Sequence, residues 1–79
     1  MDRKELQRRL KDEGIDPSSY ELAGGLPEEN YCLEERANGW AVYYSERASR
    51  VGERLFTTED EACAYFLETL LADPTTHLT

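Results

Sequence analysis

Hydrophobic positions recur at helical spacing near the start of the chain. Leu6 and Leu10 are four residues apart, so they share one face of a helix whose other positions are mostly charged. Asp2 and Glu5 form a capping box at the start of this helix, and Gly14 supplies a left-handed stop at its end. The pattern predicts a short first helix that packs through a narrow apolar stripe.

Polar and turn-forming residues follow this helix. In residues 16–20, Asp16 can cap a single turn, and Pro17 is preorganised for the first position of that turn. Gly24 and Gly25 form a glycine pair, which permits backbone angles that other residues avoid. This pair predicts a loop that leads into a sheet.

Apolar and polar residues then alternate with the period of a strand. Residues 30–35 are predicted to form a first strand, and Asn38-Gly39 is a strong hairpin signal because both residues tolerate a positive φ. Residues 40–45 are predicted to form a second strand, rich in aromatic and β-branched side chains. The heavier face of the second strand is expected to be the core face: Trp40, Val42 and Tyr44.

The last part of the chain predicts a third strand and a long helix. A charged loop is expected over residues 46–52 and a short strand over residues 53–57. Thr58 caps the helix, Glu61 completes a second capping box, and Pro74 follows the end of the helix. The apolar residues of the helix fall on one face at helical spacing: Ala62, Cys63, Phe66, Leu67 and Leu70.

These elements predict an α+β fold with the order α-β-β-β-α. It consists of a three-stranded antiparallel meander with a long C-terminal helix packed on one face. A chain of 79 residues is expected to form one domain. We therefore expect residues 1–74 to be a single α+β domain and residues 75–79 to be a disordered tail.

The charge balance is strongly acidic. Nine basic residues stand against 17 acidic ones, for a formal net charge of −8. Such a surface repels nucleic acid and anionic membranes and attracts a basic protein partner, although solubility alone is the competing explanation. No apolar run approaches the roughly 20 residues of a membrane helix, and the charged N-terminus differs from a secretory signal. We expect a cytoplasmic protein that is a monomer or a weak dimer.

The predicted order of elements also occurs in double-stranded RNA-binding domains. Such domains neutralise phosphates, in part at the start of their second helix. In this chain that position carries Glu59, Asp60 and Glu61, which would repel an RNA backbone. We therefore expect no nucleic acid among the partners.

Few side chains are suited to catalysis. The single histidine, His77, falls in the predicted tail, where it could not be positioned for proton transfer. Cys32 and Cys63 occupy positions typical of core residues, and no zinc-binding spacing is present. We expect no enzyme, no cofactor and no metal site, with both thiols reduced and buried. A single disulfide between them is the less favoured alternative.

The candidate partner-binding residues are surface carboxylates and one tyrosine: Glu28, Glu29, Glu34, Tyr43, Glu59 and Asp60. Tyr43 lies on the lighter face of the second strand, where an exposed tyrosine among acids would anchor an interface. The alternative is that the first helix covers this face and makes Tyr43 a core residue. The pattern alone leaves both alternatives open.

Two runs of residues match a known pattern. They are WAVYYSER at residues 40–47 and FTTEDEACAYF at residues 56–66, and the GGLP at residues 24–27 fits the same pattern. These runs resemble small bacterial proteins encoded beside secreted polymorphic toxins, which are thought to be immunity proteins or uncharacterised relatives of them. In sequences of this kind a glycine is expected after Glu46-Arg47, where this chain has Ala48.

The resemblance implies that the protein acts by sequestration. An acidic surface would steer the protein onto a basic toxin, often a nuclease, and would cover the toxin's active site. A small adaptor or regulatory protein of another role, dimeric through a sheet edge, is the alternative function.

Overall fold

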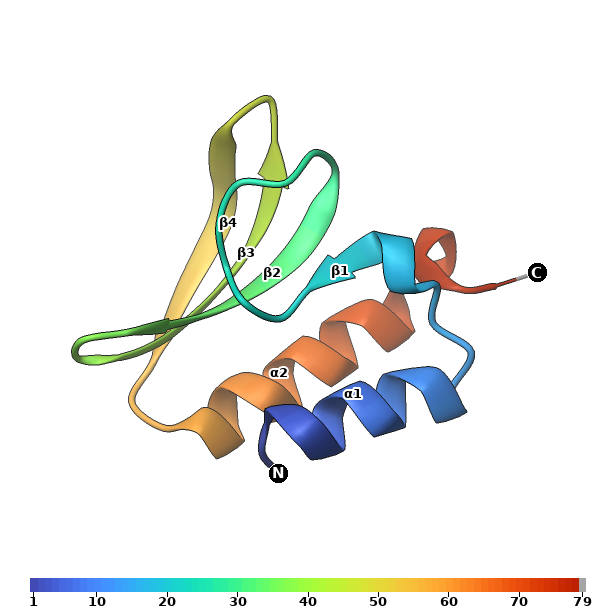
Figure 1. Cartoon of the computed structure of the whole chain (residues 1–79), viewed down its shortest axis with the longest axis horizontal. Coiled ribbons are helices and arrows are strands. Elements are labelled where there is room, and N and C mark those ends of the chain that lie inside the picture. The colour runs from blue at the N-terminus through green and yellow to red at the C-terminus, as the bar shows by residue number, and fades with distance from the viewer. Residues whose placement is uncertain (79) are drawn as a thin grey trace.

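Two helices lie side by side against one face of a four-stranded sheet in the computed structural model, which describes residues 1–78 (Figure 1). The helices and strands follow one another in this order: α1 (Arg3–Asp12), β1 (Tyr20–Glu21), β2 (Asn30–Arg36), β3 (Gly39–Glu46), β4 (Ser49–Phe56) and α2 (Glu59–Ala72). Single 3-10 turns at Pro17–Ser19 and Pro74–Thr76 complete the described chain. The predicted α+β class and the helix-strands-helix order are confirmed.

The sheet has one strand more than the sequence predicted. Its order is β1-β2-β3-β4, with β2, β3 and β4 antiparallel as expected and the two-residue β1 parallel to β2. Residues 16–20 were therefore only partly predicted, because Tyr20 leaves the capped turn and pairs with Tyr31. A strand of two residues is too short to show a period along the chain.

Both helices begin at the predicted caps. The Asp2 carboxylate accepts a hydrogen bond from the Glu5 N–H at 2.9 Å. The Thr58 hydroxyl accepts from the Glu61 N–H at 3.2 Å, which is the first half of the predicted capping box. The Glu61 carboxylate accepts from the Thr58 hydroxyl at 3.0 Å rather than from the Thr58 backbone N–H. Within residues 1–78, no helix is long and apolar enough to cross a membrane.

The first hairpin is confirmed, but its turn lies one residue earlier than predicted. Ala37 and Asn38 form the turn, and Gly39 opens β3 opposite Arg36 with a φ of 148°. A Cβ on Gly39 would lie 2.3 Å from the backbone oxygen of Phe56. Glycine is therefore needed here for a close approach of β4 as well as for its backbone angle.

The second hairpin corrects the expected charged loop over residues 46–52. Strand β3 continues to Glu46, and β4 begins at Ser49, so Arg47 and Ala48 alone form the turn. Both adopt the left-handed conformation, with φ values of 50° and 59°. Paired positive φ values match the right-handed twist of a hairpin, so a tight turn forms without a glycine.

The face of the sheet that carries the helices holds the main core. Leu6 and Leu10 of α1 meet Phe66 of α2 there, over Leu33 and Val42 of the sheet. The predicted core face of β3 is thus confirmed at Val42, whereas its neighbours Trp40 and Tyr44 are half-buried.

The opposite face, called the outer face here, carries a second and smaller buried cluster. Cys32, Ala41 and Tyr43 form this cluster, with exposed fractions of 1% or less. The outer face is covered by the long loop between β1 and β2, which crosses in front of the sheet (Figure 1). Both helices lie on the other side.

Residues 75–78 are ordered, which corrects the expectation of a disordered tail over residues 75–79. Thr76 is buried, and its hydroxyl donates to the Leu70 carbonyl oxygen at 2.8 Å. His77 forms a β-bridge with Ile15, and the Leu78 N–H donates to the carbonyl oxygen of residue 14 at 2.8 Å. These contacts extend the domain past residue 74. Residue 79 lies outside the described residues.

Candidate functional site

The six residues predicted to bind a partner lie in three separate places. Glu59 and Asp60 are at the start of α2, and Glu34 and Tyr43 are on the outer face. The glutamates at 28 and 29 lie in the loop before β2, next to the β3–β4 turn. The three places differ in how far their charges are already engaged within the fold.

The acids at the start of α2 tie the two helices together. The Asp60 carboxylate forms an ion pair with the N-terminal ammonium group of Met1, and this bond raises the pKa of that ammonium group. The Glu59 carboxylate accepts from the Arg3 N–H at 2.9 Å. Both carboxylates thus serve the packing of α1 on α2, and contact of these two residues with a partner stays a prediction.

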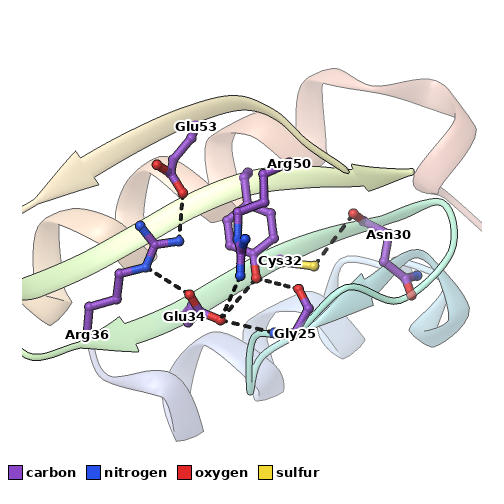
Figure 2. A network of polar contacts seen from close by, with 8 residues as sticks. Gly25, Asn30, Cys32, Glu34, Arg36, Arg50 and Glu53 are labelled. Atoms are coloured by element: carbon purple, nitrogen blue, oxygen red, sulfur yellow. Dashed lines mark hydrogen bonds and ion pairs between the residues drawn. The ribbon is translucent and has the colours of Figure 1, made fainter. Parts of the chain in front are cut away.

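Glu34 is likewise occupied, at the centre of a polar network on the outer face (Figure 2). Its carboxylate accepts from the Gly25 N–H at 3.1 Å and pairs with Arg36 at 2.8 Å and with Arg50 at 4.0 Å. The hydrogen bond from Gly25, followed by that from Arg36, lowers the pKa of Glu34. This network neutralises the carboxylate within the fold.

Tyr43 is buried, with 1% of its surface exposed, so it is no exposed interface anchor. The alternative expectation is confirmed in that Tyr43 is a core residue, but it is wrong about the first helix as the cover. The loop between β1 and β2 covers it, and its hydroxyl donates to the Gly25 carbonyl oxygen at 2.6 Å. The Arg36 and Arg50 guanidinium groups lie 5.9 and 5.2 Å from the ring centroid. Burial raises the pKa of Tyr43 to about 12.

Glu28 and Glu29 differ from the other four because they line an open cleft of about 360 Å³. We call this feature the acidic cleft. Its lining includes Asp16, Ser18, Glu28, Glu29, Tyr31 and Tyr44. They come from the turn before β1, the start of β2 and the end of β3. The fold thus gathers three carboxylates, a hydroxyl and two aromatic rings.

The acids around the acidic cleft accept hydrogen bonds within the fold at Asp16, Glu28 and Asp73, but none of them is paired with a cation within residues 1–78. Burial is the largest cause that raises the pKa of Tyr44, and four carboxylates raise it further: Glu29, Glu46, Asp73 and Glu28. Within residues 1–78, none of these four acids, nor Asp16, forms an ion pair. The negative charges therefore act together at one end of the molecule.

The aromatic side of the cleft is held firmly. Tyr31 and Tyr44 meet edge to face with their ring centroids 5.0 Å apart. The Tyr31 hydroxyl donates to the Asp73 carboxylate at 2.6 Å, which ties β2 to the end of α2. Burial, followed by the bond to Asp73, raises the pKa of Tyr31 to about 12. Both rings remain half-buried, so each offers some surface to a partner.

Backbone contacts and conformation hold Glu28 and Glu29, which we call the acidic wall of the cleft. The Glu28 carboxylate accepts from the Arg47 N–H at 2.6 Å, which joins the cleft to the β3–β4 turn. Glu29 adopts the left-handed conformation with a φ of 53°. A non-glycine residue in this conformation is strained, and such residues are concentrated at functional sites.

Sequence reasoning missed several residues of this region: Asp16, Tyr31, Tyr44, Glu46 and Asp73. The two aspartates each precede a proline and also serve as caps, which gave them a local explanation. Nothing in the order of the chain brings residue 16 beside residue 76. The fold brings them together, because the Asp16 N–H donates to the Thr76 carbonyl oxygen at 2.7 Å.

The described residues offer little to a metal ion. Within residues 1–78, no group of three or more histidine, cysteine, aspartate or glutamate side chains is placed to hold one. Cys32 and Cys63 are free and buried in different clusters, on opposite faces of the sheet. Burial raises the pKa of each thiol to about 11, so both are protonated at neutral pH. His77 is half-buried against the Leu71 carbonyl oxygen at 3.1 Å and is not in a mobile tail.

No protein-family model, curated protein or solved structure matches this chain.

Proposed function

We propose that the protein is a non-catalytic binding module that holds a basic protein partner against the acidic cleft. One observation carries this proposal: the carboxylates around Tyr44 act together on one phenol, and no ion pair within residues 1–78 neutralises them. Keeping like charges close together costs stability, so their retention favours a use in recognition.

The physical advantage of such a site is fast and selective encounter. An acidic end on a small molecule of net charge −8 steers a cationic partner and raises its association rate. The half-buried rings of Tyr31 and Tyr44 then supply apolar contact once the partner has arrived. Charge would bring the partner, and the aromatic surface would retain it.

A basic toxin is the partner that we propose, in line with the resemblance to immunity proteins. Such a protein would cover the toxin's active site with the acidic cleft and would need no chemistry of its own. A toxin that acts inside the producing cell would be met in the cytoplasm, which is the compartment we propose.

The test compares two variants of equal net charge in affinity capture from a lysate of the source cells. The first carries glutamine in place of three carboxylates of the acidic end: Glu28→Gln, Glu29→Gln and Glu46→Gln. The second neutralises three exposed acids of the helices: Asp12→Asn, Glu13→Gln and Glu68→Gln. We expect the unmodified protein to capture a basic protein at about 50 mM salt and to release it at about 500 mM.

The first variant should lose most of the captured protein, and the second should retain it. Equal losses in both variants would mean that net charge alone attracts the partner and that the acidic cleft has no special role. Capture of an acidic partner, or capture that is insensitive to salt, would contradict the proposal directly.

Self-association through β4 is a second candidate function, that of a dimeric adaptor. Strand β4 is the edge of the sheet, and all of its residues except Phe56 are exposed. Val51 and Leu55 are 46% and 68% exposed there. An open edge with apolar side chains can pair with the same edge of a second copy. The β4 region is also less acidic, since Arg50 and Arg54 flank Glu53.

Light scattering distinguishes this candidate from the first. A dimer whose formation is abolished by Leu55→Lys would support the adaptor function. A protein that is still monomeric at about 100 µM would exclude the adaptor function. A pairing of two eight-residue strands that serves a function should form well below that concentration.

A further inference from the structure

Residues 22–29 cross the outer face of the sheet, and we call this segment the flap. It joins β1 to β2 and is seen in front of the sheet in Figure 1. The Cys32, Ala41 and Tyr43 cluster lies beneath it. The end of the flap carries Glu28 and Glu29 of the acidic cleft. One segment therefore covers a small core and supplies part of the proposed binding surface.

Apolar burial contributes little to holding the flap. Gly24 is its only buried residue, and Pro27 is half-buried. Leu22, at the start of the segment, is half-buried against the main core, and its carbonyl oxygen accepts from the Arg3 side chain at 3.3 Å, so it is the fixed end of the flap. Leu26 is 44% exposed, although it is the largest apolar side chain near the middle of the segment. A segment with so few buried apolar contacts belongs to the low-stability end of a protein. Polar contacts must therefore hold the flap.

Two hydrogen bonds to Gly25 fasten the flap, and we call Gly25, Glu34 and Tyr43 the latch (Figure 2). The Tyr43 hydroxyl donates to the Gly25 carbonyl oxygen at 2.6 Å. The Gly25 N–H donates to the Glu34 carboxylate at 3.1 Å. The N–H and the carbonyl oxygen of Gly25 are thus both hydrogen-bonded, to side chains of β2 and β3 instead of to the backbone of a neighbouring strand.

The glycine next to the latch is required by its geometry. A Cβ on Gly24 would lie 2.4 Å from the Glu34 carboxylate, and Gly24 has a φ of 77°. Only glycine permits this approach of the backbone to the carboxylate. The glycine pair thus has a function in closing the flap as well as in turning the chain.

Glu34 is also held by residues outside the flap. Arg36 lies 2.8 Å from its carboxylate and also pairs with Glu53 of β4 at 2.6 Å. Arg50 approaches the same carboxylate at 4.0 Å. Side chains of β2 and β4 therefore fix the acceptor of the latch, and the flap docks on a prepared site.

The outer face of the sheet also buries one polar side chain that has no partner within residues 1–78. The Ser45 hydroxyl, on the outer face at the end of β3, is fully buried and has no hydrogen-bond partner within residues 1–78. A buried polar group without a partner carries a desolvation cost that exposure to water relieves.

We infer that the flap opens as a unit without unfolding of the main core, and that the latch sets the position of Glu28 and Glu29. Gly25 is three residues before Glu28, and the second anchor of the segment is the bond from the Arg47 N–H to the Glu28 carboxylate at 2.6 Å. The acidic wall is therefore suspended between two fixed points. Glu34 and Tyr43 are positioning residues that act on the cleft from the outer face. This second part of the inference rests on the proposed function.

The two native cysteines report on opening of the flap. Cys32 lies under the flap and Cys63 lies in the main core, so a thiol-reactive reagent distinguishes the two regions. The rate of modification at each cysteine is measured in native buffer by mass spectrometry. We expect Cys32 to react at least tenfold faster than Cys63. Tyr43→Phe should raise the Cys32 rate by about three- to tenfold, the effect of one lost hydrogen bond, and leave the Cys63 rate unchanged.

Equal modification rates at both cysteines, rising together in Tyr43→Phe, would contradict the inference that the flap opens by itself. Only global unfolding would then expose Cys32. Tyr65→Phe is the matched control. It removes a tyrosine hydroxyl that makes no hydrogen bond with another residue of 1–78, on the helix side of the sheet. It should leave both rates as they are.

Binding of a hexa-arginine peptide, measured by calorimetry, tests the positioning role. Tyr43→Phe leaves the net charge and the surface carboxylates unchanged, so a loss of affinity of about threefold or more would come from displacement of the acidic wall. Faster modification of Cys32 with unchanged affinity would overturn the positioning role. Absence of peptide binding by the unmodified protein would overturn the proposed function and the positioning role together, whereas the flap is decided by the cysteine rates alone.

Discussion

Ala48 is held in a backbone conformation that suits glycine. Its φ of 59°, in the β3–β4 turn, brings the Cβ close to the following carbonyl oxygen, which costs roughly 1–2 kcal/mol. Glycine avoids this cost but loses more entropy on folding. We therefore expect Ala48→Gly to raise the free energy of unfolding by about 0.5–1 kcal/mol, as measured by urea denaturation.

Ala37 is the control for this prediction. It is an exposed alanine in the other two-residue turn, but its φ is not positive. Glycine at this position relieves nothing, so Ala37→Gly should lower stability slightly. If both substitutions changed stability in the same direction, the backbone conformation of Ala48 would not be the cause.

At the level of elements, one hydrogen bond joins the sheet to the end of α2. The Tyr31 hydroxyl donates to the Asp73 carboxylate at 2.6 Å, and this bond, followed by those from Thr75, lowers the pKa of Asp73. A carboxyl group whose pKa is lowered in the folded state stabilises the fold above its unfolded pKa of about 3.9. That stabilisation is lost as the pH falls through the folded pKa.

Tyr31→Phe should therefore lower the free energy of unfolding by about 1 kcal/mol at pH 7. The difference from the unmodified protein should shrink as the pH falls from 4 to about 2, because a protonated Asp73 no longer favours the bond. Urea denaturation at several pH values measures this difference. A difference that is constant with pH would indicate lost packing of the Tyr31 ring rather than a lost bond to a carboxylate.

The elements differ in how well the sequence predicts them, and burial explains the difference. Helix α2 has one buried face and a capping box, so spacing and cap agree on its start and its core residues. Strand β4 is exposed at nearly every position, so neither face selects apolar residues and the period of two is absent. The turn before it contains Arg47 and Ala48, whose positive φ values no residue preference indicates.

The candidate site was predictable only where charge is local. The acidic pair Glu28 and Glu29 stands out in the sequence and does line the cleft. Glu34 and Tyr43 were equally plausible by type, but contacts with a distant loop decide their burial. The approach of Asp16 to the end of the chain depends on tertiary contacts, which one sequence does not reveal.

At the scale of the whole molecule, the chain closes on itself through its last residues. The Thr76 hydroxyl donates to two carbonyl oxygens of the α2 end, and His77 pairs with Ile15. Ending the chain after Pro74 should lower the free energy of unfolding by about 2 kcal/mol, since both burial and hydrogen bonds are lost. Leu78→Ser is the control, because this side chain is 59% exposed and its loss should change little. An unaffected truncated protein would mean that the tail contacts contribute no stability.

Charge and backbone strain coincide at Glu29, where stability and binding should oppose each other. Its φ of 53° is strained for any residue with a Cβ, and its carboxylate adds to the field at Tyr44. Glu29→Gly relieves the strain and removes one charge from a repulsive group. We expect it to raise the free energy of unfolding by about 0.5–1 kcal/mol and to weaken binding of a hexa-arginine peptide severalfold.

Ala48→Gly separates the two effects, because it relieves the same kind of strain in the neighbouring turn without changing charge. It should raise stability by a similar amount and leave the affinity for the peptide unchanged. If Glu29→Gly stabilised the protein without weakening binding, the carboxylate would not serve recognition. If it destabilised the protein, Glu29 would contribute to the fold itself. A gain in stability together with a loss of affinity, seen for Glu29 alone, is the behaviour expected of a residue retained for binding.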